Sequence, residues 1–371
     1  MAKLFFDNIA IAGLACAVPS FSQAINSDPG HHAAEYIKGV KRQTGVARRH
    51  ISLTEQTVTD LGTAALVKAL ERAAWDKDSL DGIVFMSQMP DFNPGTGNAF
   101  VLHNQFGLHK DVLAFDITLG CSSFPYGLSV CGGLLQQPDI KRIAMISGDN
   151  AWPDYPSVQG IIDAPVFLFG EGTTALLLEK RPSPPIHITL HSDGSGYSSL
   201  FNPFVGSRNA WRKYSRGRLS NGKEFDNFLA FGNYMDGMEI ASFSMTTVVD
   251  FIREFLEWQG KKATDYDALL LHQANLQMMK SIARQLGVGM EKMPVSLDRY
   301  ANTSGASILL TMADAYGGRQ DEYKEPLSLL GCTFGIGLSW GVIDFQLDPG
   351  VVAPIFESGW RSEEGFLHEI E

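Results

Sequence analysis

The sequence predicts an α/β fold made of two similar halves. Short runs that are apolar at every position, such as residues 82–86 and 142–147, alternate with longer segments in which apolar residues recur every three or four positions, such as residues 58–74. Fully apolar runs are typical of strands buried on both faces, so we expect sheets of mainly parallel strands with helices on either side. A likeness between two stretches of the chain is the second observation behind this fold class.

The individual elements follow from the local pattern. The elements expected in the first part of the chain are strands at residues 9–15, 82–86, 115–119 and 142–147, and helices at residues 58–74 and 122–137. In the first helix, Leu61, Ala65 and Leu66 fall on one face. The second helix is apolar, with glycine and serine along one side, which predicts that it is buried.

Two stretches, residues 57–86 and 246–271, follow the same plan. Each runs through a helical segment to a tryptophan and then to an apolar strand, and a glutamine follows soon after. Such a repeat predicts a duplicated half, although a chance likeness over so few positions is the alternative. The proline-rich stretch at 181–185 marks the expected boundary, between an N-terminal half at residues 1–180 and a C-terminal half at residues 181–371.

Residues 194–234 are the least regular part of the chain. They are rich in glycine, serine, asparagine and arginine, but they also hold many aromatic residues, which a disordered linker would lack. We expect a long ordered excursion here. It either covers a pocket or is a solvent-facing insertion with no role.

The composition excludes several classes of protein. The chain has 371 residues, 44% of them hydrophobic and 19% charged, and its formal net charge is −11 from 30 basic and 41 acidic residues. This negative charge argues against nucleic acid or an anionic membrane as the main partner. No apolar stretch approaches the ~20 residues of a membrane helix. Asp7 interrupts the apolar run at the N-terminus, so a signal peptide is not expected either.

The four cysteines, Cys16, Cys121, Cys131 and Cys332, form no CxxC pair. A zinc site and a disulfide framework are therefore not expected, and widely spaced single cysteines are typical of a reducing compartment. No dinucleotide fingerprint, P-loop or HExxH motif is present. We expect a cytoplasmic protein with no metal and no cofactor.

Cys121 stands where a strand is expected to end and a helix to begin, in Gly120-Cys121-Ser122-Ser123. At this place the positive end of the helix dipole is expected to lower the pKa of the thiol and make it nucleophilic. A buried cysteine at a helix start is also common as a small core residue.

Three further segments place polar or small residues at the ends of predicted elements. His272 directly follows the apolar run 269–271, so it stands at the carboxyl edge of a sheet, where α/β proteins bind ligands. Asn302 lies in residues 300–307, ahead of another helix, and residues 331–341 form a Gly-rich apolar turn. Taken singly, such a histidine is often structural, the asparagine can be an N-cap and the turn can serve close packing.

Together these four segments resemble the condensing enzymes of the thiolase superfamily, and most closely the β-ketoacyl-acyl-carrier-protein synthase III group. The match rests on the order and spacing of Cys121, the His272-Gln-Ala-Asn275 segment and the Asn302-Thr-Ser segment, and it covers nearly the whole chain. The resemblance implies a thiolase-like five-layered αβαβα fold with two similar halves, working as a homodimer.

The resemblance also implies a role for each residue. Cys121 would take an acyl group as a thioester. His272 and Asn302 would bind the thioester carbonyl of a malonyl group and promote loss of CO2, because two neutral donors can stabilise the enolate that forms. The backbone N–H groups of Cys121 and Ile336 would form an oxyanion hole, although the family usually has glycine where Ile336 stands.

Departures from the family predict an unusual acyl donor. Gly39 and Gln43 stand where the acetyl-CoA-using members have a tryptophan and an arginine, and Asp163 falls near a second CoA-binding arginine. Losing an aromatic stack and two cations would weaken binding of the CoA phosphates. We therefore expect an acyl group delivered on an acyl carrier protein rather than acetyl-CoA.

Acyl length is expected to be less restricted than in the family. There, a phenylalanine reaches across the dimer to limit the acyl chain, whereas here Gly95 falls at that position, with Phe92 nearby. A longer or branched chain would then fit. The residues expected to contact substrate are Gly95, Phe92, Asn275 and Gly335.

Docking of the carrier protein is expected on the helix that follows His272. Lys280 and Arg284 are four residues apart, hence on one helix face, and a cationic face suits an acidic carrier. The alternative is that both are simply solvated.

Three functions remain open. The first is decarboxylative condensation of the acyl group on Cys121 with malonyl-acyl-carrier protein or a related extender, outside the first step of core fatty-acid biosynthesis, in a specialised lipid or polyketide pathway. The second is an acyltransferase that passes the acyl group to an alcohol or amine, which would not need an enolate-stabilising asparagine. The third is a catalytically silent subunit that binds the carrier protein, which the presence of the whole Cys-His-Asn set disfavours.

Overall fold

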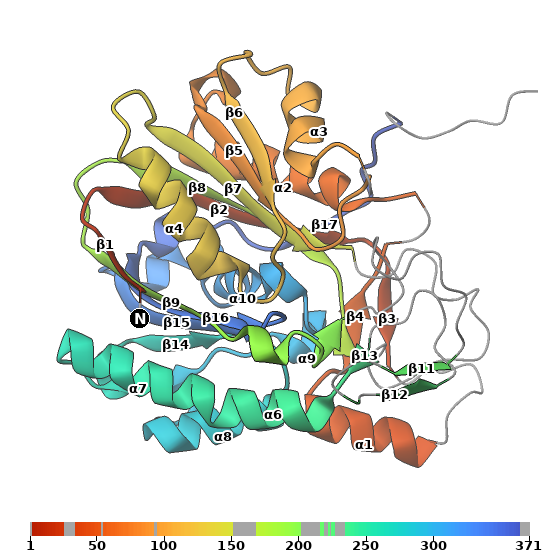
Figure 1. Cartoon of the computed structure of the whole chain (residues 1–371). Helices are drawn as coiled ribbons and strands as arrows, with labels where there is room; N and C mark the ends of the chain where they lie inside the picture. Colours follow the sequence, from red (N-terminus) through yellow and green to blue (C-terminus); the bar gives the residue numbers. More distant parts are fainter. Residues whose placement is uncertain are drawn as a thin grey trace, which may run out of the picture.

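The structure is a computed structural model that describes residues 2–25, 34–52, 55–92, 95–150, 168–201, 216–218, 222, 224–226 and 234–363. Its elements form five layers, which stack from top to bottom in Figure 1. The helices are α2 (Val58–Ala73) and α3 (Asn98–Gln105) on one outer side, α4 (Ser123–Leu135) and α10 (Ser307–Tyr316) in the centre, and α6 (Gly237–Met245), α7 (Thr247–Gln259) and α8 (Leu276–Leu286) on the other outer side. The predicted five-layered αβαβα arrangement is confirmed.

Two sheets separate these helical layers. The first has the strand order β17 (Phe356–Ser358), β2 (Ile9–Pro19), β8 (Gly172–Lys180), β7 (Arg142–Asp149), β5 (Gly82–Met86) and β6 (Leu113–Ile117). The second has the order β1 (Ala2–Phe6), β9 (Ile186–Ser192), β16 (Ser339–Leu347), β15 (Leu327–Gly335) and β14 (Ala268–Leu271). The expected strands and helices therefore exist, with ends that differ from the predicted ones by a few residues.

The strand directions are mixed, so the prediction of mainly parallel strands is wrong. β5 pairs in parallel with β6 and β7, but β8 is antiparallel to β2 and β7, and β16 is antiparallel to both of its neighbours. The apolar runs predict only that both faces of a strand are covered. Helices on both sides of each sheet cover the faces whatever the strand direction.

Alternate side chains of a buried strand supply two different cores. In β5, Ile83 and Phe85 pack on the outer side with Leu61 of α2, whereas Val84 and Met86 pack in the central layer. All of these side chains are at most 1% exposed. A strand in this position must be apolar throughout, and this is the pattern that the sequence displays.

The two stretches that resemble each other in sequence have the same succession of elements. α2 is followed by a 3₁₀ helix at Lys77–Ser79 and by β5, and α7 is followed by a 3₁₀ helix at Ala263–Asp265 and by β14. The ends of the chain cross between the sheets, because β1 pairs with β9 of the second sheet and β17 pairs with β2 of the first.

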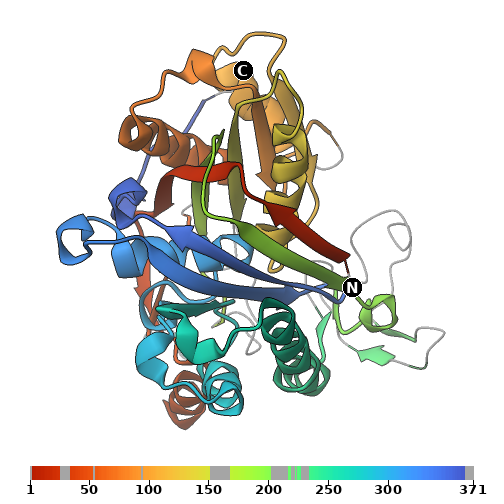
Figure 2. The same cartoon turned by 90° about the vertical axis from the view of Figure 1, so that its left-hand side faces the viewer.

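Helix α1 (Ala34–Thr44) lies beside α8, and both are seen below the second sheet in Figure 2. The contact is close at Gly45, which has φ +84°, and an added Cβ there would meet Leu276 Cβ at 2.7 Å. Glycine is thus required at the end of α1 for both its backbone angle and its packing. In the described part of the chain, no helix is both long and apolar enough to cross a membrane.

The excursion at residues 194–234 is described in part. β10 (Leu200–Phe201) pairs with β13 (Tyr234–Met235), which holds the two ends of the excursion together, and β11 (Arg216–Arg218) pairs with β12 (Glu224–Asp226). The remainder lies outside the described residues, so the expectation that it covers a pocket stays a prediction.

Candidate active site

Cys121 lies between the end of β6 and the start of α4, as the sequence predicts. A turn in which Ser123 N donates to Gly120 O at 2.8 Å carries the chain into the helix. The cysteine is 7% exposed. Its Sγ lies 3.8 Å from the hydroxyl of Ser304, which comes from a distant part of the sequence.

The expectation that helix placement lowers the pKa of this thiol is wrong. Burial is the main cause that raises the pKa of Cys121 to about 12; the hydroxyl of Ser304 lowers this pKa, and the nearby carboxylate of Asp149 raises it by less. Removing water from around a thiolate disfavours the charged form. The resting cysteine is therefore a neutral thiol at physiological pH, and it must lose its proton as it reacts.

Gly335 lies directly against Cys121. An added Cβ at this position would come within 2.4 Å of Cys121 Cβ and 3.3 Å of Sγ, so only glycine fits. The turn after Gly335 is tied to the start of α4, because Ser339 Oγ donates to Ile336 O at 2.7 Å and is bonded to Ser122 Oγ at 2.6 Å. The backbone near the nucleophile is thus fixed, while the oxyanion role of Ile336 stays a prediction.

His272 follows β14 and is 2% exposed. Its backbone N–H donates to Cys332 O at 2.9 Å, and its ring packs edge-on against Phe334. Ring atom Nδ1 is bonded to Ser307 Oγ at 2.7 Å. Burial lowers the pKa of His272 to about 3, so the imidazole is neutral at physiological pH.

Asn302 is held by its backbone on both sides. Its N–H donates to Leu168 O at 2.9 Å, and its own carbonyl accepts from Gly170 N at 3.0 Å. Its side-chain Oδ1 accepts from Ser304 N at 2.9 Å. Because the amide oxygen is engaged, the Nδ2 donor is the part of the side chain left for a ligand. Asn302 does not cap α10, whose N-cap is Ala306.

Residues 302–307, which we call the asparagine segment, bring the three predicted catalytic residues together. The segment contains Asn302, its Ser304 contacts Cys121, and its Ser307 is bonded to His272. Three residues that are far apart in the sequence are thus connected through one short turn and the first residue of α10.

The asparagine segment is itself seated tightly on the first sheet. An added Cβ at Gly305 would come within 2.7 Å of Ser123 Oγ and 2.8 Å of Ser147 Oγ. Ser123 Oγ also donates to Gly305 O at 3.2 Å. Close packing of the segment on the end of β7 and the start of α4 fixes its distance from Cys121.

The remaining predicted residues lie away from these contacts. Asn275 is 8% exposed and is the N-cap of α8, where its Oδ1 accepts from Gln277 N at 2.8 Å and from Met278 N at 3.4 Å. Phe92 is 39% exposed, and Gly95 is exposed next to it. Their contacts with substrate stay predictions.

The candidate docking and CoA positions lie on the outer helices. Lys280 and Arg284 are both exposed on α8. Gly39 and Gln43 lie on α1, which packs beside α8. Asp163 is outside the described residues. Among the residues that the structure describes, no group of three or more potential ligands could hold a metal ion.

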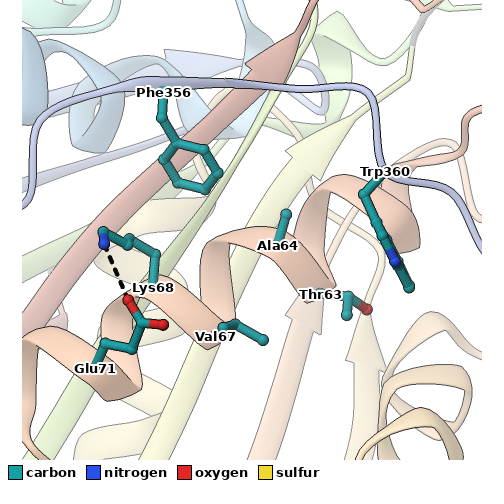
Figure 3. A pocket seen from close by; sticks show the side chains of 7 residues that line it. All are labelled: Thr63, Ala64, Val67, Lys68, Glu71, Phe356 and Trp360. Atoms are coloured by element: carbon teal, nitrogen blue, oxygen red, sulfur yellow. Dashed lines mark hydrogen bonds and ion pairs between the residues drawn. The ribbon is translucent and has the colours of Figure 1, made fainter.

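A groove of about 440 Å³ lies on the outer face of α2, away from the predicted catalytic residues. Figure 3 shows the rings of Phe356 and Trp360 lying over the helix, with Lys68 and Glu71 joined by an ion pair. The residues that line the groove are Thr63, Ala64, Val67, Lys68, Glu71, Phe356 and Trp360. No predicted site residue is among them.

Sequence reasoning missed three residues beside the site: Ser304, Ser307 and Asp149. The two serines stand inside the motif that contains Asn302, so their position was visible, but their partners were not. Asp149 ends an apolar strand, as His272 nearly does, and the same rule of strand-end polar residues could have singled it out.

Family models match both parts of the chain. The model of 3-oxoacyl-[acyl-carrier-protein] synthase III matches residues 115–194, and the model of its C-terminal part matches residues 256–347. Over 304 residues the chain is 30% identical to the β-ketoacyl-[acyl-carrier-protein] synthase III of Methylococcus capsulatus, covering 81% of this chain and 88% of that protein. The chain belongs to the 3-oxoacyl-acyl-carrier-protein synthase III family.

Solved structures agree with this assignment. The 3-oxoacyl-(acyl-carrier protein) synthase of Burkholderia xenovorans superposes with a TM-score of 0.86 at 29% identity, covering 96% of this chain and 99% of that one. The priming β-ketosynthase of the R1128 polyketide pathway shares the fold, with a TM-score of 0.74 at 23% identity over 92% of this chain and 97% of that one. The synthase III resemblance and the thiolase-like fold are confirmed, and the protein is a condensing acyltransferase of this family.

Proposed function

We propose that the enzyme joins an acyl group held on Cys121 to the two-carbon unit that remains when a malonyl thioester on acyl carrier protein loses CO2. The observation that carries this proposal is the asparagine segment. It supplies Asn302, contacts Cys121 through Ser304 and holds His272 through Ser307. Simple acyl transfer would need the cysteine but not this arrangement of two neutral donors.

The first step loads the acyl group. Cys121 Sγ attacks the carbonyl carbon of the acyl thioester, and the oxyanion is held by the backbone N–H groups of Cys121 and Ile336. The carbon–sulfur bond of the donor then breaks, and the donor leaves as a free thiol. The fixed turn at Gly335, packed on the cysteine, supports a preformed oxyanion hole.

The second step removes CO2 from the malonyl thioester. Negative charge moves onto the thioester oxygen as the carboxylate leaves, and the Nε2–H of His272 and the Nδ2–H of Asn302 hold it. We place the ring proton on Nε2, with the hydroxyl of Ser307 donating to Nδ1. A pKa of about 3 keeps the imidazole neutral, so it stabilises the enolate as a hydrogen-bond donor and does not protonate it.

The third step forms the carbon–carbon bond. The enolate carbon attacks the thioester carbonyl on Cys121, the tetrahedral intermediate collapses, and the cysteine sulfur leaves. The product is a β-ketoacyl group on the carrier protein. The cysteine regains a proton and the cycle closes.

We further propose that the primer is not acetyl-CoA. An added Cβ at Gly39 would meet nothing within 4 Å, so packing does not prevent a large side chain there. We take the missing tryptophan as a sign that a different acyl donor binds here. The exposed cations Lys280 and Arg284 on the neighbouring helix support docking of an acidic carrier protein. We therefore propose a role in a specialised lipid or polyketide pathway.

Intact-protein mass spectrometry and CO2 release test the proposal. Wild-type protein and Cys121→Ala are mixed with acyl-CoA and acyl-carrier-protein donors of increasing chain length, and then with carboxyl-labelled malonyl-carrier protein. We expect a mass gain on the wild type alone, from medium or long acyl-carrier protein, and labelled CO2 once both substrates are present. Loading without CO2 release in the presence of alcohols or amines would point to simple acyl transfer, and rapid loading from acetyl-CoA would overturn the assignment of the primer.

A further inference from the structure

Ser307 is the polar partner of the His272 imidazole in the part of the chain that the structure describes. Its Oγ lies 2.7 Å from Nδ1, and none of the described residues bonds to Nε2. Both residues are at most 2% exposed, and Phe334 packs edge-on against the imidazole. Water therefore has little access to the pair, and the place of the imidazole proton depends on this one hydrogen bond.

A buried chain of hydroxyl groups holds Ser307 from behind. Thr311 Oγ1 donates to the carbonyl of Ser307 at 2.7 Å. Its one proton is thereby engaged, so Ser296 is the donor in the 2.8 Å contact between Ser296 Oγ and Thr311 Oγ1. Ser296 N in turn donates to Gln273 Oε1 at 3.0 Å, and Gln273 directly follows His272. The contacts form a closed loop that runs from His272 through Gln273, Ser296, Thr311 and Ser307 back to Nδ1.

This loop leaves the imidazole little freedom. Gln273 and Thr311 are 0% exposed, and Ser296 is 1% exposed. The amide of Gln273 is oriented at both of its ends, because Nε2 donates to Leu271 O at 2.9 Å while Oε1 accepts from Ser296. Buried networks whose polar groups are satisfied make a site rigid. The imidazole is therefore held at the end of β14 by its neighbour in the sequence and by the start of α10.

The direction of the bond between Ser307 and His272 follows from a count of protons. If the hydroxyl donates, Nδ1 accepts and the imidazole proton is on Nε2, where it can bind a ligand oxygen. If Nδ1 donates instead, the hydroxyl proton of Ser307 has no acceptor among the described residues, and a buried donor without a partner is unfavourable. The lone pair of Nε2 would then also repel the oxygen of a bound thioester. The first arrangement is the stable one.

We propose that Ser307 is a positioning residue that holds His272 in the tautomer with its proton on Nε2. It acts through His272 and not on the substrate. Its hydroxyl keeps the Nε2–H donor available to the thioester oxygen, on which negative charge collects as CO2 leaves. No covalent bond forms or breaks at Ser307. The inference rests on the proposed function in that the donor serves an enolate.

The same hydrogen bond distinguishes two kinds of chemistry. An Nε2–H donor stabilises an enolate, whereas an Nε2 lone pair can take a proton from an alcohol or amine and act as a general base. Acyl transfer to such an acceptor would use the lone pair. By donating to Nδ1, Ser307 favours condensation over base-assisted acyl transfer on this scaffold.

The first measurement is the tautomer itself. Protein containing ¹⁵N-labelled histidine is studied by NMR at pH 7 without substrate, as wild type and as Ser307→Ala, and His272→Gln identifies the His272 signals among those of nine histidines. We expect the wild type to show a protonated Nε2 and an unprotonated Nδ1. In Ser307→Ala we expect the preference for Nε2–H to weaken about tenfold, because one neutral hydrogen bond is lost.

The second measurement is the rate of each step. Ser307→Ala should load an acyl group on Cys121 at the wild-type rate but release labelled CO2 from malonyl-carrier protein about tenfold more slowly, because only the second step uses Nε2–H. Ser307→Thr keeps a hydroxyl and should restore both the tautomer and the CO2 release. Ser244→Ala is the matched control: this serine is 0% exposed in α6, where its Oγ donates to Ile240 O, and its loss should change neither step.

Each outcome decides the proposal. A wild type with its proton on Nδ1 would overturn it, and this measurement does not require any variant to fold. Slower CO2 release by Ser307→Ala with the wild-type tautomer would also overturn it, because Ser307 would then act by packing alone. A wild type with its proton on Nε2 that releases no CO2 with any acyl donor would refute the proposed function and leave the tautomer assignment standing.

Discussion

Gly335 leaves no room for a side chain beside the nucleophile, since an added Cβ would lie 2.4 Å from Cys121 Cβ. We expect Gly335→Ala to displace the cysteine and slow its acylation about 100-fold, because misplacing a reacting group by about 1 Å has effects of that size. Acylation is followed by intact mass. Gly133→Ala is the control: it lies in α4, where an added Cβ meets nothing within 4 Å, and should raise the free energy of unfolding by about 0.5–1 kcal/mol without slowing acylation. Normal acylation of Gly335→Ala would show that the turn can move enough to accommodate a methyl group beside Cys121.

The sequence predicts which residues are reactive better than it predicts their ionisation state. Cys121, His272 and Asn302 each stand at the end of an element or in a loop, and local pattern is enough to single them out. The ionisation of Cys121 is set by burial and by Ser304, which is 183 positions away, so local pattern predicts the wrong direction for its pKa. Long-range contacts decide what a side chain does after local sequence has placed it.

Helix α8 begins close to His272 and runs along the outer surface. Its N-cap residue, Asn275, is also expected to contact substrate, and this can be tested. Asn275→Asp keeps the capping oxygen but loses the Nδ2–H donor, whereas Asn275→Ala loses both. We expect Asn275→Ala to lower the free energy of unfolding by about 1 kcal/mol and Asn275→Asp to leave it unchanged. If Nδ2 contacts substrate, as we expect, both variants raise the KM for the carrier-bound malonyl group. If Asn275→Asp keeps the wild-type KM, Asn275 caps the helix and does not contact the substrate. Urea unfolding and steady-state kinetics provide the two measurements.

The sequence predicts which strands and helices form, but it does not predict whether neighbouring strands run parallel or antiparallel. The strand at Gly82–Met86 is found where its apolar run predicts it, and the helix at Val58–Ala73 ends one residue short of the prediction. Parallel or antiparallel pairing depends on which strands become neighbours, as when β15 returns through a three-residue turn into antiparallel β16. An apolar run does not indicate the direction of the neighbouring strand, because helices cover both faces of the sheet in either case.

For the whole molecule, the resemblance to the family predicts the five layers. It was not used to predict that the two ends of the chain exchange sheets. β1 lies in the second sheet and β17 in the first, so each sheet receives a strand from the far end of the chain. These short terminal strands belong to no internal repeat, and their sequences do not indicate which sheet each of them joins. The sequence pattern likewise does not indicate which surface contacts a second copy of the chain.

The free edge of the first sheet is the place where we expect that second copy. β6 is the last strand of its sheet, and Leu113 on this strand is 40% exposed, with Phe100 of the adjacent α3 at 53% and Phe92 at 39%. An exposed edge with apolar side chains pairs readily with another edge, so two copies would form one continuous sheet and bring Phe92 of each copy toward its partner. We expect the wild type to show twice the 40.6 kDa chain mass in light scattering. Leu113→Glu should weaken the dimer at least about tenfold, since burying a charge at the edge costs more than about 1.4 kcal/mol. Met238→Glu, at a side chain 86% exposed on α6, should leave the dimer intact. A wild type that runs at the mass of one chain would contradict the expected homodimer.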